Sequence, residues 1–577
     1  AIIRASMGIY VYERYRAAFA QAIGQALNAP ASEIERAVKP AEPAHGDLAF
    51  AAFAFAKAQR KAPAAIALSL ERELAIPGMQ VTAAGPYLNA RFAPMPFSAQ
   101  VLEEVRAAGT SYGASQAGSG KTAVIDYSSP NIAKPIAFHH IRSTVIGHSL
   151  ANLYRSQGYR VEGINYLGDW GKQFGLVAVG FEEYGEPARK HEMAHLVEVY
   201  VKANACAEKD PAFDARAREF FRRMEKSDPA AIAVWRELRE TSLKDFRGIY
   251  RRLDIDFEHY EGESRYQGQI DAVIDRIAKT VGVKESEGAL VVDMPYAEGE
   301  PPVLLRKQDG STLYATRDLA AAIDRYERFR FDLALYVVAL DQSFYFRQLF
   351  AVLERMGMPW AKGCVHVGFG RVHGMSTRRG QIVLLEDVLN EAKGRALEKV
   401  SENQEAGRIQ TNDPEQLAEQ VGLGAIVFGD LKNRRTTDYT FDWEELLSFE
   451  GHTGPYLQYA HARACSILRK AGQAPKDADA ARLTQPEEQT VLRAVARFPS
   501  AVASAVQDYE PSTVARHLLD LAAEFSKWYT LGNQDRDKRV LVDDAATRAA
   551  RLALTDAARL TLASGLSLLG IPAPQKM

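Results

Sequence analysis

The spacing of apolar residues changes character several times along the chain. From about residue 10 to residue 105 the apolar positions recur at helical intervals, and this segment closes with a strand-like alternation over residues 85–92. A glycine-rich stretch over residues 107–121 then predicts a flexible boundary. We therefore expect an α+β N-terminal domain over residues 1–110.

A strand–helix–strand pattern follows this boundary. Residues 123–127 form a short apolar run that suits a buried parallel strand, residues 141–157 have helical periodicity, and residues 159–166 predict a second strand. This order predicts a βαβ unit and, with it, a doubly wound parallel sheet of the Rossmann type. Alternating helices and strands resume after residue 319 and lead to a polar loop over residues 374–380.

These patterns predict an α/β fold with helical additions. We expect a Rossmann-like catalytic domain over residues 121–380, interrupted by a charged helical insertion at about 185–255. Connecting helices over residues 381–444 should lead to an all-α C-terminal domain over residues 445–577, where the pattern is almost purely that of amphipathic helices. Ligands of doubly wound sheets bind beyond the carboxyl ends of the strands, which directs attention to the loops after residues 127 and 370.

Composition narrows the class of protein without indicating a function. With 577 residues, 47% of them apolar and 25% charged, the chain is an ordinary globular protein of several domains. The formal net charge of -2 means that any nucleic-acid surface must come from a local patch. Cys206, Cys364 and Cys465 lack a zinc-type spacing, so we expect a reducing compartment and no protein-bound metal. Because neither a membrane-length apolar run nor a signal pattern is present, we expect a cytoplasmic protein without a membrane partner.

A candidate phosphate site lies between the first predicted strand and helix. Lys134, His139 and His140 can donate to phosphate oxygens there, and the start of the helix offers free backbone N–H groups. The same residues also suit a solvated polar turn that caps the helix. Spacing alone leaves both interpretations open.

The residues around this loop resemble the first signature of class I aminoacyl-tRNA synthetases in its arginyl form. Residues 129–134 (Ser-Pro-Asn-Ile-Ala-Lys) are similar to its lead-in, and residues 140–144 (His-Ile-Arg-Ser-Thr) are similar to its end. Residues 165–175 (Asn-Tyr-Leu-Gly-Asp-Trp-Gly-Lys-Gln-Phe-Gly) resemble the next arginyl block almost letter for letter. Residues 374–380 (Gly-Met-Ser-Thr-Arg-Arg-Gly) resemble the second nucleotide signature of the class.

The resemblance implies an ATP site that is built from both signatures. The catalytic residues that it implies are Lys134, His139, His140 and Arg378. The residues that it implies for ATP binding are Ser129, Pro130, His139, His140, Gly374, Met375, Ser376, Thr377 and Arg378. Mg²⁺ is expected to be bound through the nucleotide rather than in a cage of protein ligands. All of this requires the loops near residues 131–142 and 374–380 to converge over one nucleotide.

The first signature departs from the arginyl pattern at two positions. Ala137 stands in place of its first histidine, and His139 stands in place of a glycine that lets adenine approach the backbone closely. Either the loop is re-set so that His139 serves as the missing histidine, or ATP binding is impaired.

An arginine site needs planar, bidentate acceptors for the guanidinium. Tyr314 and Asp318 lie four residues apart and therefore on one helical face, although Asp318 could instead pair with Arg317 or Arg325. By resemblance to arginyl synthetases, the pocket should be lined by Asn131, Glu263, Tyr314, Asp318 and Gln342. In that arrangement Asp318 holds the guanidinium, while Asn131 and Gln342 hold the amino-acid backbone.

Candidate RNA contacts lie at both ends of the chain. Tyr456, Tyr459 and Arg463 recur at helical spacing, which suits either core packing or a stacking platform for anticodon bases. The block around them resembles the arginyl anticodon-binding domain, for which Phe525 and Tyr529 are further candidates. The N-terminal domain is similar to the arginyl module thought to touch the tRNA elbow.

The resemblance implies an arginine–tRNA ligase. Such an enzyme uses ATP to convert L-arginine into arginyl-adenylate and transfers the arginyl group to the 3′ end of tRNA(Arg). We expect a monomer whose partners are tRNA(Arg), L-arginine and ATP. The alternative is a catalytically impaired relative that acts as a tRNA-binding protein.

Overall fold

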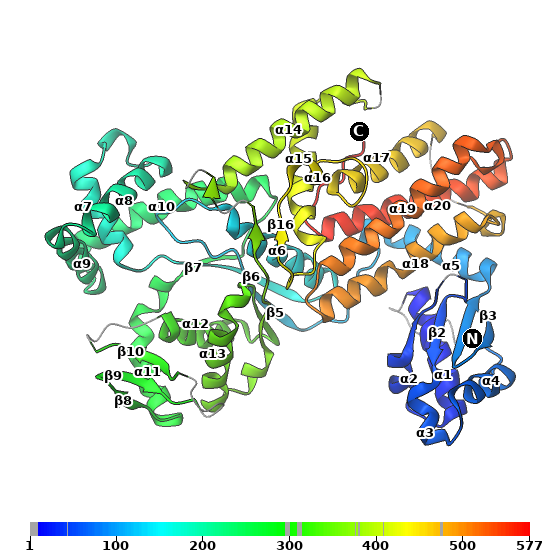
Figure 1. The fold of residues 1–577 in the computed structure, drawn as a ribbon, viewed down its shortest axis with the longest axis horizontal. Helices are drawn as coiled ribbons and strands as arrows, with labels where there is room; N and C mark the ends of the chain where they lie inside the picture. Colours follow the sequence, from blue (N-terminus) through cyan, green and yellow to red (C-terminus); the bar gives the residue numbers. More distant parts are fainter. Residues whose placement is uncertain are drawn as a thin grey trace.

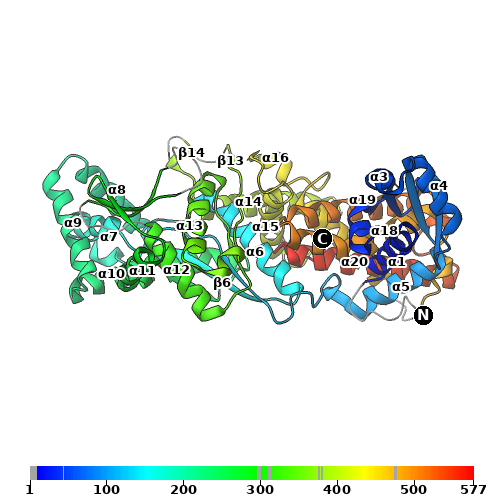
Figure 2. The same ribbon diagram turned by 90° about the horizontal axis from the view of Figure 1, so that it is seen from below.

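The computed structural model describes residues 10–42, 44–294, 301–308, 314–374, 377–378, 381–407, 409–472 and 477–577. They form an elongated molecule in which a helical insertion and the N-terminal domain lie at opposite ends (Figures 1 and 2). The parallel sheet lies between them, beside the long helices of the C-terminal part (Figure 1).

The N-terminal domain is an antiparallel sheet packed against helices. Its elements are α1 (Val11–Leu27), α2 (Ala31–Ala37), β1 (Val38–Pro40), β2 (Leu48–Ala51), α3 (Ala56–Gln59), α4 (Pro63–Glu73), β3 (Met79–Ala84), β4 (Tyr87–Phe92) and α5 (Pro94–Ala108). The strands pair in the order β1-β2-β4-β3. The ring of Tyr15 on α1 lies 4.8 Å from that of Phe92 on β4, so helix and sheet share one core.

The central sheet is parallel and has the strand order β12-β11-β5-β6-β7. Its strands are β5 (Thr122–Asp126), β6 (Arg160–Leu167), β7 (His259–Gly262), β11 (Leu333–Tyr336) and β12 (Cys364–His366). The strand order reverses at β5, because the chain continues to β6 on one side and returns later to β11 on the other. A crevice therefore opens at the carboxyl end of β5, and the expected doubly wound sheet is confirmed.

All residues of β5 are buried because helices cover both faces of the sheet. Ala123 and Ile125 belong to the core that includes α6, whereas Val124 belongs to the core that includes α12 and α13. The helices of this domain are α6 (Ile141–Ser156), α11 (Ile270–Thr280), α12 (Tyr314–Phe329) and α13 (Ser343–Arg355), and β8 (Lys284–Ser286), β9 (Ala289–Val292) and β10 (Val303–Arg306) form a small antiparallel sheet. Because successive side chains of β5 point to opposite faces of the sheet, this strand contributes to two separate cores.

The insertion between β6 and β7 is helical. It contains α7 (Lys172–Tyr184), α8 (Met193–Ala207), α9 (Pro211–Glu225) and α10 (Pro229–Arg252). Asp210 and Asp228 cap α9 and α10, and a proline at the first turn of each helix favours the same start. α7 begins before the insertion expected from the sequence. Its residues Leu176 and Val179 belong to a small hydrophobic core within the insertion.

Long helices make up the C-terminal part of the chain. The elements after β12 are β13 (Val372–His373), β14 (Thr377–Arg378), β15 (Gln381–Ile382), α14 (Leu385–Glu405), α15 (Pro414–Leu431), β16 (Tyr439–Thr440), α16 (Trp443–Leu446), α17 (Gly454–Ala471), α18 (Pro486–Gln507), α19 (Ser512–Gln534) and α20 (Ala545–Leu568). α15 and α17 touch through their backbones, since a Cβ on Gly454 would lie 2.2 Å from the carbonyl oxygen of Gly424. The all-α C-terminal domain expected from the sequence is therefore present.

The glycine-rich stretch after α5 is not the flexible boundary that its composition suggests. Tyr112 is only 1% exposed, stacks on Phe498 of α18 at 6.0 Å, and donates its hydroxyl to the carbonyl oxygen of Val495 at 3.2 Å. Gly113 is needed beside it, because a Cβ there would lie 2.7 Å from the Phe498 ring. One aromatic anchor thus fixes the N-terminal domain to the C-terminal helices.

Within the described ranges, none of the helices is both long and apolar enough to cross a membrane. The described side chains also include no cluster of three or more His, Cys, Asp or Glu residues that could hold a metal ion. The three cysteines are free, and Cys364 and Cys465 are buried.

The buried ring of Tyr112 predicts a stability effect. Tyr112→Ala should destabilise the protein by about 3–5 kcal/mol, because it removes a fully buried aromatic ring and leaves a cavity. Thermal unfolding checks this as a lower Tm. Tyr87→Ala, which truncates an aromatic that is 43% exposed, is the matched control and should leave Tm nearly unchanged. Equal Tm values for the two variants would contradict the anchoring role.

Candidate active site

The two nucleotide loops meet through their backbones. The amide of Phe138 donates to the carbonyl oxygen of Val383 at 2.8 Å, and the amide of Leu385 donates to that of Ile136 at 2.9 Å. The segment that follows the second loop therefore lies directly against the first loop. The two loops are therefore close together in space, as the sequence interpretation requires.

The second loop is held at its start as well. β13 leads into it and pairs in parallel with β16. Gly374 follows with a φ of +88°, a left-handed conformation that favours glycine. β14 and β15 then form an antiparallel hairpin, which includes the backbone of Thr377 and Arg378. The expected ATP ligands Met375 and Ser376 lie outside the described residues.

The first loop has an unusual backbone. Ser128, Ser129 and Ala133 have φ values of +70°, +50° and +62°, a region that residues other than glycine rarely adopt. Such conformations persist where the surrounding structure imposes them, and they concentrate at functional sites. The hydroxyl of Ser129 donates to Asp126 Oδ1 at 2.9 Å, which ties the loop to the end of β5.

The histidine turn forms a 3₁₀ helix, Phe138–His140, in front of α6. His139 is exposed and has an ordinary helical backbone, so a side chain fits where the resembling signature has glycine. Burial lowers the pKa of His140 to about 4, and its Nδ1 lies 3.1 Å from the carbonyl oxygen of Ala137. Because a carbonyl only accepts, Nδ1 carries the proton and Nε2 is the acceptor of a neutral ring. The two histidine rings lie 4.2 Å apart.

Lys134 and Asn131 lie on the exposed side of the first loop. Lys134 Nζ is 5.2 Å from the centre of the Tyr200 ring, so the loop contacts α8 of the insertion. Asn131 covers Gly168 at the end of β6, where a Cβ would lie only 2.0 Å from its Oδ1. Glycine at 168 therefore makes room for the asparagine side chain.

A pocket of about 260 Å³ opens at the carboxyl ends of β5 and β11. It is lined by Asp126, Ser129, Tyr166, Tyr314, Asp318, Ala321, Arg325, Tyr336, Val338, Gln342, Tyr345 and Phe346. Tyr314, Asp318 and Gln342 are among the residues expected to bind arginine, and the structure brings them together here. The remaining two, Asn131 and Glu263, do not line it.

Asp318 is the carboxylate of this pocket that remains open to a ligand. Within the described residues it forms no ion pair with its neighbours in sequence, because Arg317 contacts Glu263 at 3.5 Å and Arg325 contacts Asp126 at 2.8 Å. Tyr345 donates its hydroxyl to Asp318. Burial raises the pKa of Asp318 to about 6. The alternative interpretation of Asp318 as one half of a helix-start ion pair is not supported.

Glu263 lies beside this pocket at the end of β7. Burial raises its pKa to about 7, and the nearby charge of Asp318 acts in the same direction, against the lowering effect of Arg317. The next residue, Ser264, donates its amide and its hydroxyl to Asp169, each at 2.9 Å. Asp169 also pairs with Arg239 of α10 at 3.0 Å. The insertion thus helps to place Glu263.

Sequence reasoning missed the base of the pocket. Arg325 is buried there, paired with Asp126, and its guanidinium lies 4.9 Å from the ring centre of Tyr166 and 5.5 Å from that of Tyr336. Asp126 ends β5, so the rule that ligands bind beyond strand ends could have identified it. Arg325 gives no such signal, because its partners come from other strands.

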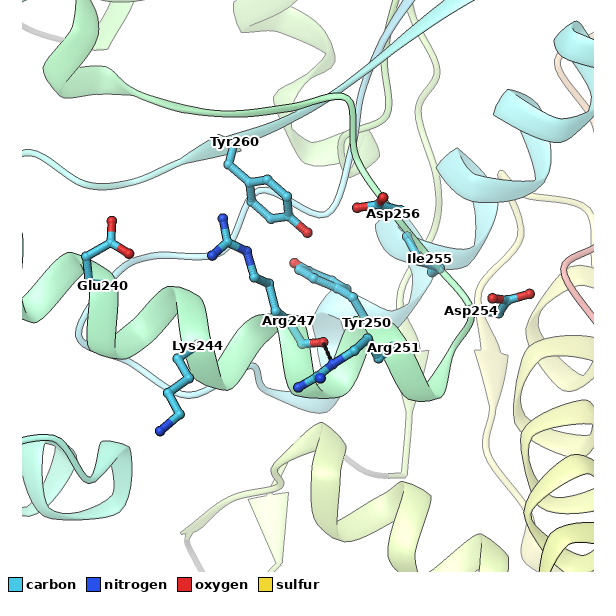
Figure 3. A pocket seen from close by; sticks show the side chains of 9 residues that line it. All are labelled: Glu240, Lys244, Arg247, Tyr250, Arg251, Asp254, Ile255, Asp256 and Tyr260. Atoms are coloured by element: carbon cyan, nitrogen blue, oxygen red, sulfur yellow. Dashed lines mark hydrogen bonds between the residues drawn. The ribbon is translucent and has the colours of Figure 1, made fainter.

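A larger pocket of about 540 Å³ lies against α10 and contains none of the predicted site residues (Figure 3). Lys244, Arg247 and Arg251 line one side of it, and the guanidinium of Arg247 lies 4.9 Å from the ring centre of Tyr260. Its lining residue Tyr250 reaches Ser128 beyond the end of β5 at 2.7 Å, but no residue at the carboxyl end of β11 lines this pocket. The smaller pocket is therefore the better candidate for substrate binding.

The predicted anticodon residues form a partly buried cluster, with one exception. The guanidinium of Arg463 lies between two rings, 4.6 Å from the centre of Tyr459 and 4.8 Å from that of Tyr529. Tyr456 is half-buried near them. Phe525 was wrongly predicted as a base-stacking residue, because it is fully buried in the core of the C-terminal helices and presents no face to a ligand.

Comparison with known families covers almost the whole chain. Residues 13–92 match the arginyl tRNA synthetase N terminal domain, residues 102–443 match the catalytic domain of tRNA synthetases class I (R), and residues 457–577 match the DALR anticodon binding domain.

Individual relatives agree with these matches. The chain is 43% identical to the arginine–tRNA ligase of Alkaliphilus metalliredigens over 541 residues, which covers 92% of this chain and 94% of that relative. It is 42% identical over 539 residues to that of Streptococcus pneumoniae, with the same coverage of 92% and 94%.

Solved structures have the same architecture. The arginyl-tRNA synthetase of Thermus thermophilus superposes with a TM-score of 0.79 at 27% identity, covering 97% of this chain and 100% of that one. The Plasmodium falciparum enzyme superposes with a TM-score of 0.84 at 22% identity, covering 99% and 100%, and supports the fold alone. By its sequence identity and its domain matches, the chain belongs to the arginyl-tRNA synthetase family.

Proposed function

We propose that this chain is an arginine–tRNA ligase that activates L-arginine with ATP and transfers it to tRNA(Arg). The observation that carries this proposal is the meeting of the two nucleotide loops beside a carboxylate-lined pocket. The comparisons support the same activity through relatives of known name.

Arginine binds in the pocket at the ends of β5 and β11 in this proposal. Asp318 accepts the guanidinium, Tyr345 holds that carboxylate in place, and Tyr314 and Gln342 border the remaining space. Glu263 adds a second negative charge next to the pocket. A guanidinium suits this arrangement because its planar fork can donate to more than one acceptor at once.

ATP lies between the histidine turn and the second loop. His139 and Lys134 are exposed donors for phosphate oxygens, and Ser129, Pro130 and the backbone of the second loop border the nucleotide. His140 is placed to act there too, and the negative charge of a triphosphate would raise its low pKa and restore a donor on Nε2. Arg378 completes the set of residues assigned to the phosphates. Mg²⁺ enters with the phosphates of ATP.

The reaction has two steps. A carboxylate oxygen of arginine attacks the α-phosphorus, the bond to the bridging oxygen breaks, and pyrophosphate leaves with its electron pair. The terminal ribose hydroxyl of the tRNA then attacks the arginyl carbonyl, loses its proton and releases AMP. Positioning and charge stabilisation dominate both steps, because the protein forms no covalent bond to the substrates.

The other domains bind the RNA in this proposal. Residues 445–577 read the anticodon, residues 381–444 contact the stem, and residues 1–110 contact the elbow. The protein acts as a cytoplasmic monomer.

Arginine-dependent exchange of pyrophosphate into ATP, followed by charging of tRNA(Arg), tests the activity directly. The purified chain should form arginyl-tRNA, and lysine should not replace arginine because an ammonium group lacks the planar fork. Absent charging together with retained tRNA binding would instead assign the chain to RNA binding without catalysis.

Replacing the pocket carboxylate should affect arginine alone. Asp318→Asn should raise the arginine KM about 10–100-fold, since a hydrogen bond to a charged group contributes about 1.5–3 kcal/mol, and should leave the ATP KM unchanged. In the wild type, the arginine KM should rise as the pH falls below about 7, because Glu263 and then Asp318 become protonated and lose their negative charge. Glu327→Gln, on the exposed side of α12, is the matched control. An arginine KM that is flat between pH 5.5 and 8, roughly the range spanned by such raised carboxyl pKa values, would exclude a role of both carboxyls in arginine binding.

The Tyr459–Arg463–Tyr529 stack predicts an RNA phenotype. Tyr459→Ala should weaken tRNA binding about 5–100-fold, because stacking of a base on an aromatic ring contributes about 1–3 kcal/mol, while the arginine KM stays the same. Tyr459→Phe keeps the ring and should retain the affinity. If filter binding gives one Kd for all three proteins, Tyr459 serves only in packing.

A further inference from the structure

Arg142 is a buried cation whose contacts join the two nucleotide loops. It lies in the first turn of α6, two residues after His140, and is only 1% exposed. An arginine side chain stays charged inside a protein, so burial is tolerated only when charged and polar partners surround it.

The partners of Arg142 come from outside its own helix. Its Nε lies 3.1 Å from Oδ2 of Asp430 on α15, and its Nη1 donates to the carbonyl oxygen of Thr437 at 2.9 Å. The central carbon of the guanidinium lies over the ring of Tyr439, 5.2 Å from its centre. Tyr439 in turn donates its hydroxyl to Asp430 Oδ2 at 3.1 Å. One guanidinium therefore holds a carboxylate, a carbonyl and an aromatic ring at once.

These partners lead to the second loop. Tyr439 begins β16, which pairs with β13, and β13 ends one residue before Gly374. The amide of Tyr439 donates to the carbonyl oxygen of Arg371 at 3.1 Å, which continues the same contact. Arg142 thus fixes the start of the second loop, while the backbone bonds of Phe138 and Leu385 fix its end.

We propose that Arg142 is a positioning residue that sets the spacing between the histidine turn and β13, the strand that leads into the second loop at Gly374, and so the width of the ATP site. The proposal rests on the ligase function proposed above and concerns the same site. Arg142 contacts no substrate and acts through Asp430, Tyr439 and β16. Its planar fork matters, because a lysine ammonium cannot bind the carboxylate and the carbonyl in the same geometry or stack on the ring with a flat face.

The test compares Arg142→Lys and Tyr439→Phe with the wild type in arginine-dependent pyrophosphate exchange, with tRNA(Arg) present in every assay. Arg142→Lys should raise the ATP KM about 10-fold or more and lower kcat, and Tyr439→Phe should raise the ATP KM by about 5-fold, as expected for loss of one ordinary hydrogen bond. The arginine KM and the Kd for tRNA(Arg) should stay within about 2-fold of wild type, a range that separates them from a tenfold change. Tyr439→Phe keeps the ring and so gives a folded protein even if Arg142→Lys does not.

Arg551→Lys provides a matched control for loss of a buried arginine. Arg551 is 3% exposed, its Nε lies 2.6 Å from Glu488, and it donates to the carbonyl oxygens of Asp537 and Arg539, but all of these lie in the C-terminal helices. This variant should lower Tm and leave the ATP KM unchanged.

The outcomes separate the proposal from the function on which it rests. If the wild type exchanges pyrophosphate and both variants lose activity only in proportion to their folded fraction, with an unchanged ATP KM, Arg142 is a structural ion pair and the proposal is wrong. An equal rise of the ATP KM in Arg551→Lys would overturn it as well. A wild type without exchange would remove the ligase function, and the positioning role with it.

Discussion

Backbone hydrogen bonds between residues 136–138 and 383–385 bring the two halves of the proposed nucleotide site together. The two segments lie far apart in the sequence, and the first follows β5 while the second comes after β12, so their contact depends on the parallel sheet in which β5 and β12 flank β11. Main-chain donors and acceptors make this contact, which explains how the loops can meet although Ala137 and His139 depart from the family signature. The identity of those side chains affects how phosphate is bound rather than whether the loops converge.

The charged groups in and beside the proposed arginine pocket differ in whether they have a partner. Asp126 is paired with Arg325 and Glu263 with Arg317, whereas Asp318 has no ion pair within the described residues; burial raises the pKa values of both Asp318 and Glu263. A bound guanidinium stays charged at any physiological pH, so it would lower these pKa values, and near neutrality binding would release protons. Burial thus disfavours the charged carboxylates in the empty pocket, and the bound cation would stabilise them. An uncharged analogue of the same shape would not stabilise the carboxylates. This difference favours binding of arginine over the analogue.

The sequence predicted those parts of the fold that local patterns determine. The apolar run of β5 and its crossover to β6 identify the sheet, and the strand-end rule indicates the loops that meet beside the pocket. Residue type alone could not distinguish Phe525 from Tyr529, because both lie on the same long amphipathic helix and only packing decides which of them reaches the surface. The 107–121 segment was misjudged for a related reason, since its glycines obscure one buried anchor, Tyr112. The sequence-based predictions failed where packing against a distant segment decides whether a side chain is buried.

Buried ion pairs that cross between elements recur around this site. Arg142–Asp430 joins α6 to α15, Arg325–Asp126 joins α12 to β5, and Arg239–Asp169 joins α10 to the loop after β6. The net stability that such a pair contributes is small, because desolvation offsets much of the attraction. Removing one partner is far more damaging, since it leaves an uncompensated charge in the interior. Pairs of this kind are therefore better understood as geometric constraints than as sources of stability, because any rearrangement that separates the partners is penalised by several kcal/mol, on the order of 3–5. The site is assembled from segments that are distant in the sequence. The energetic penalty for separating the ion pairs therefore keeps the loops in one relative position during substrate binding and release.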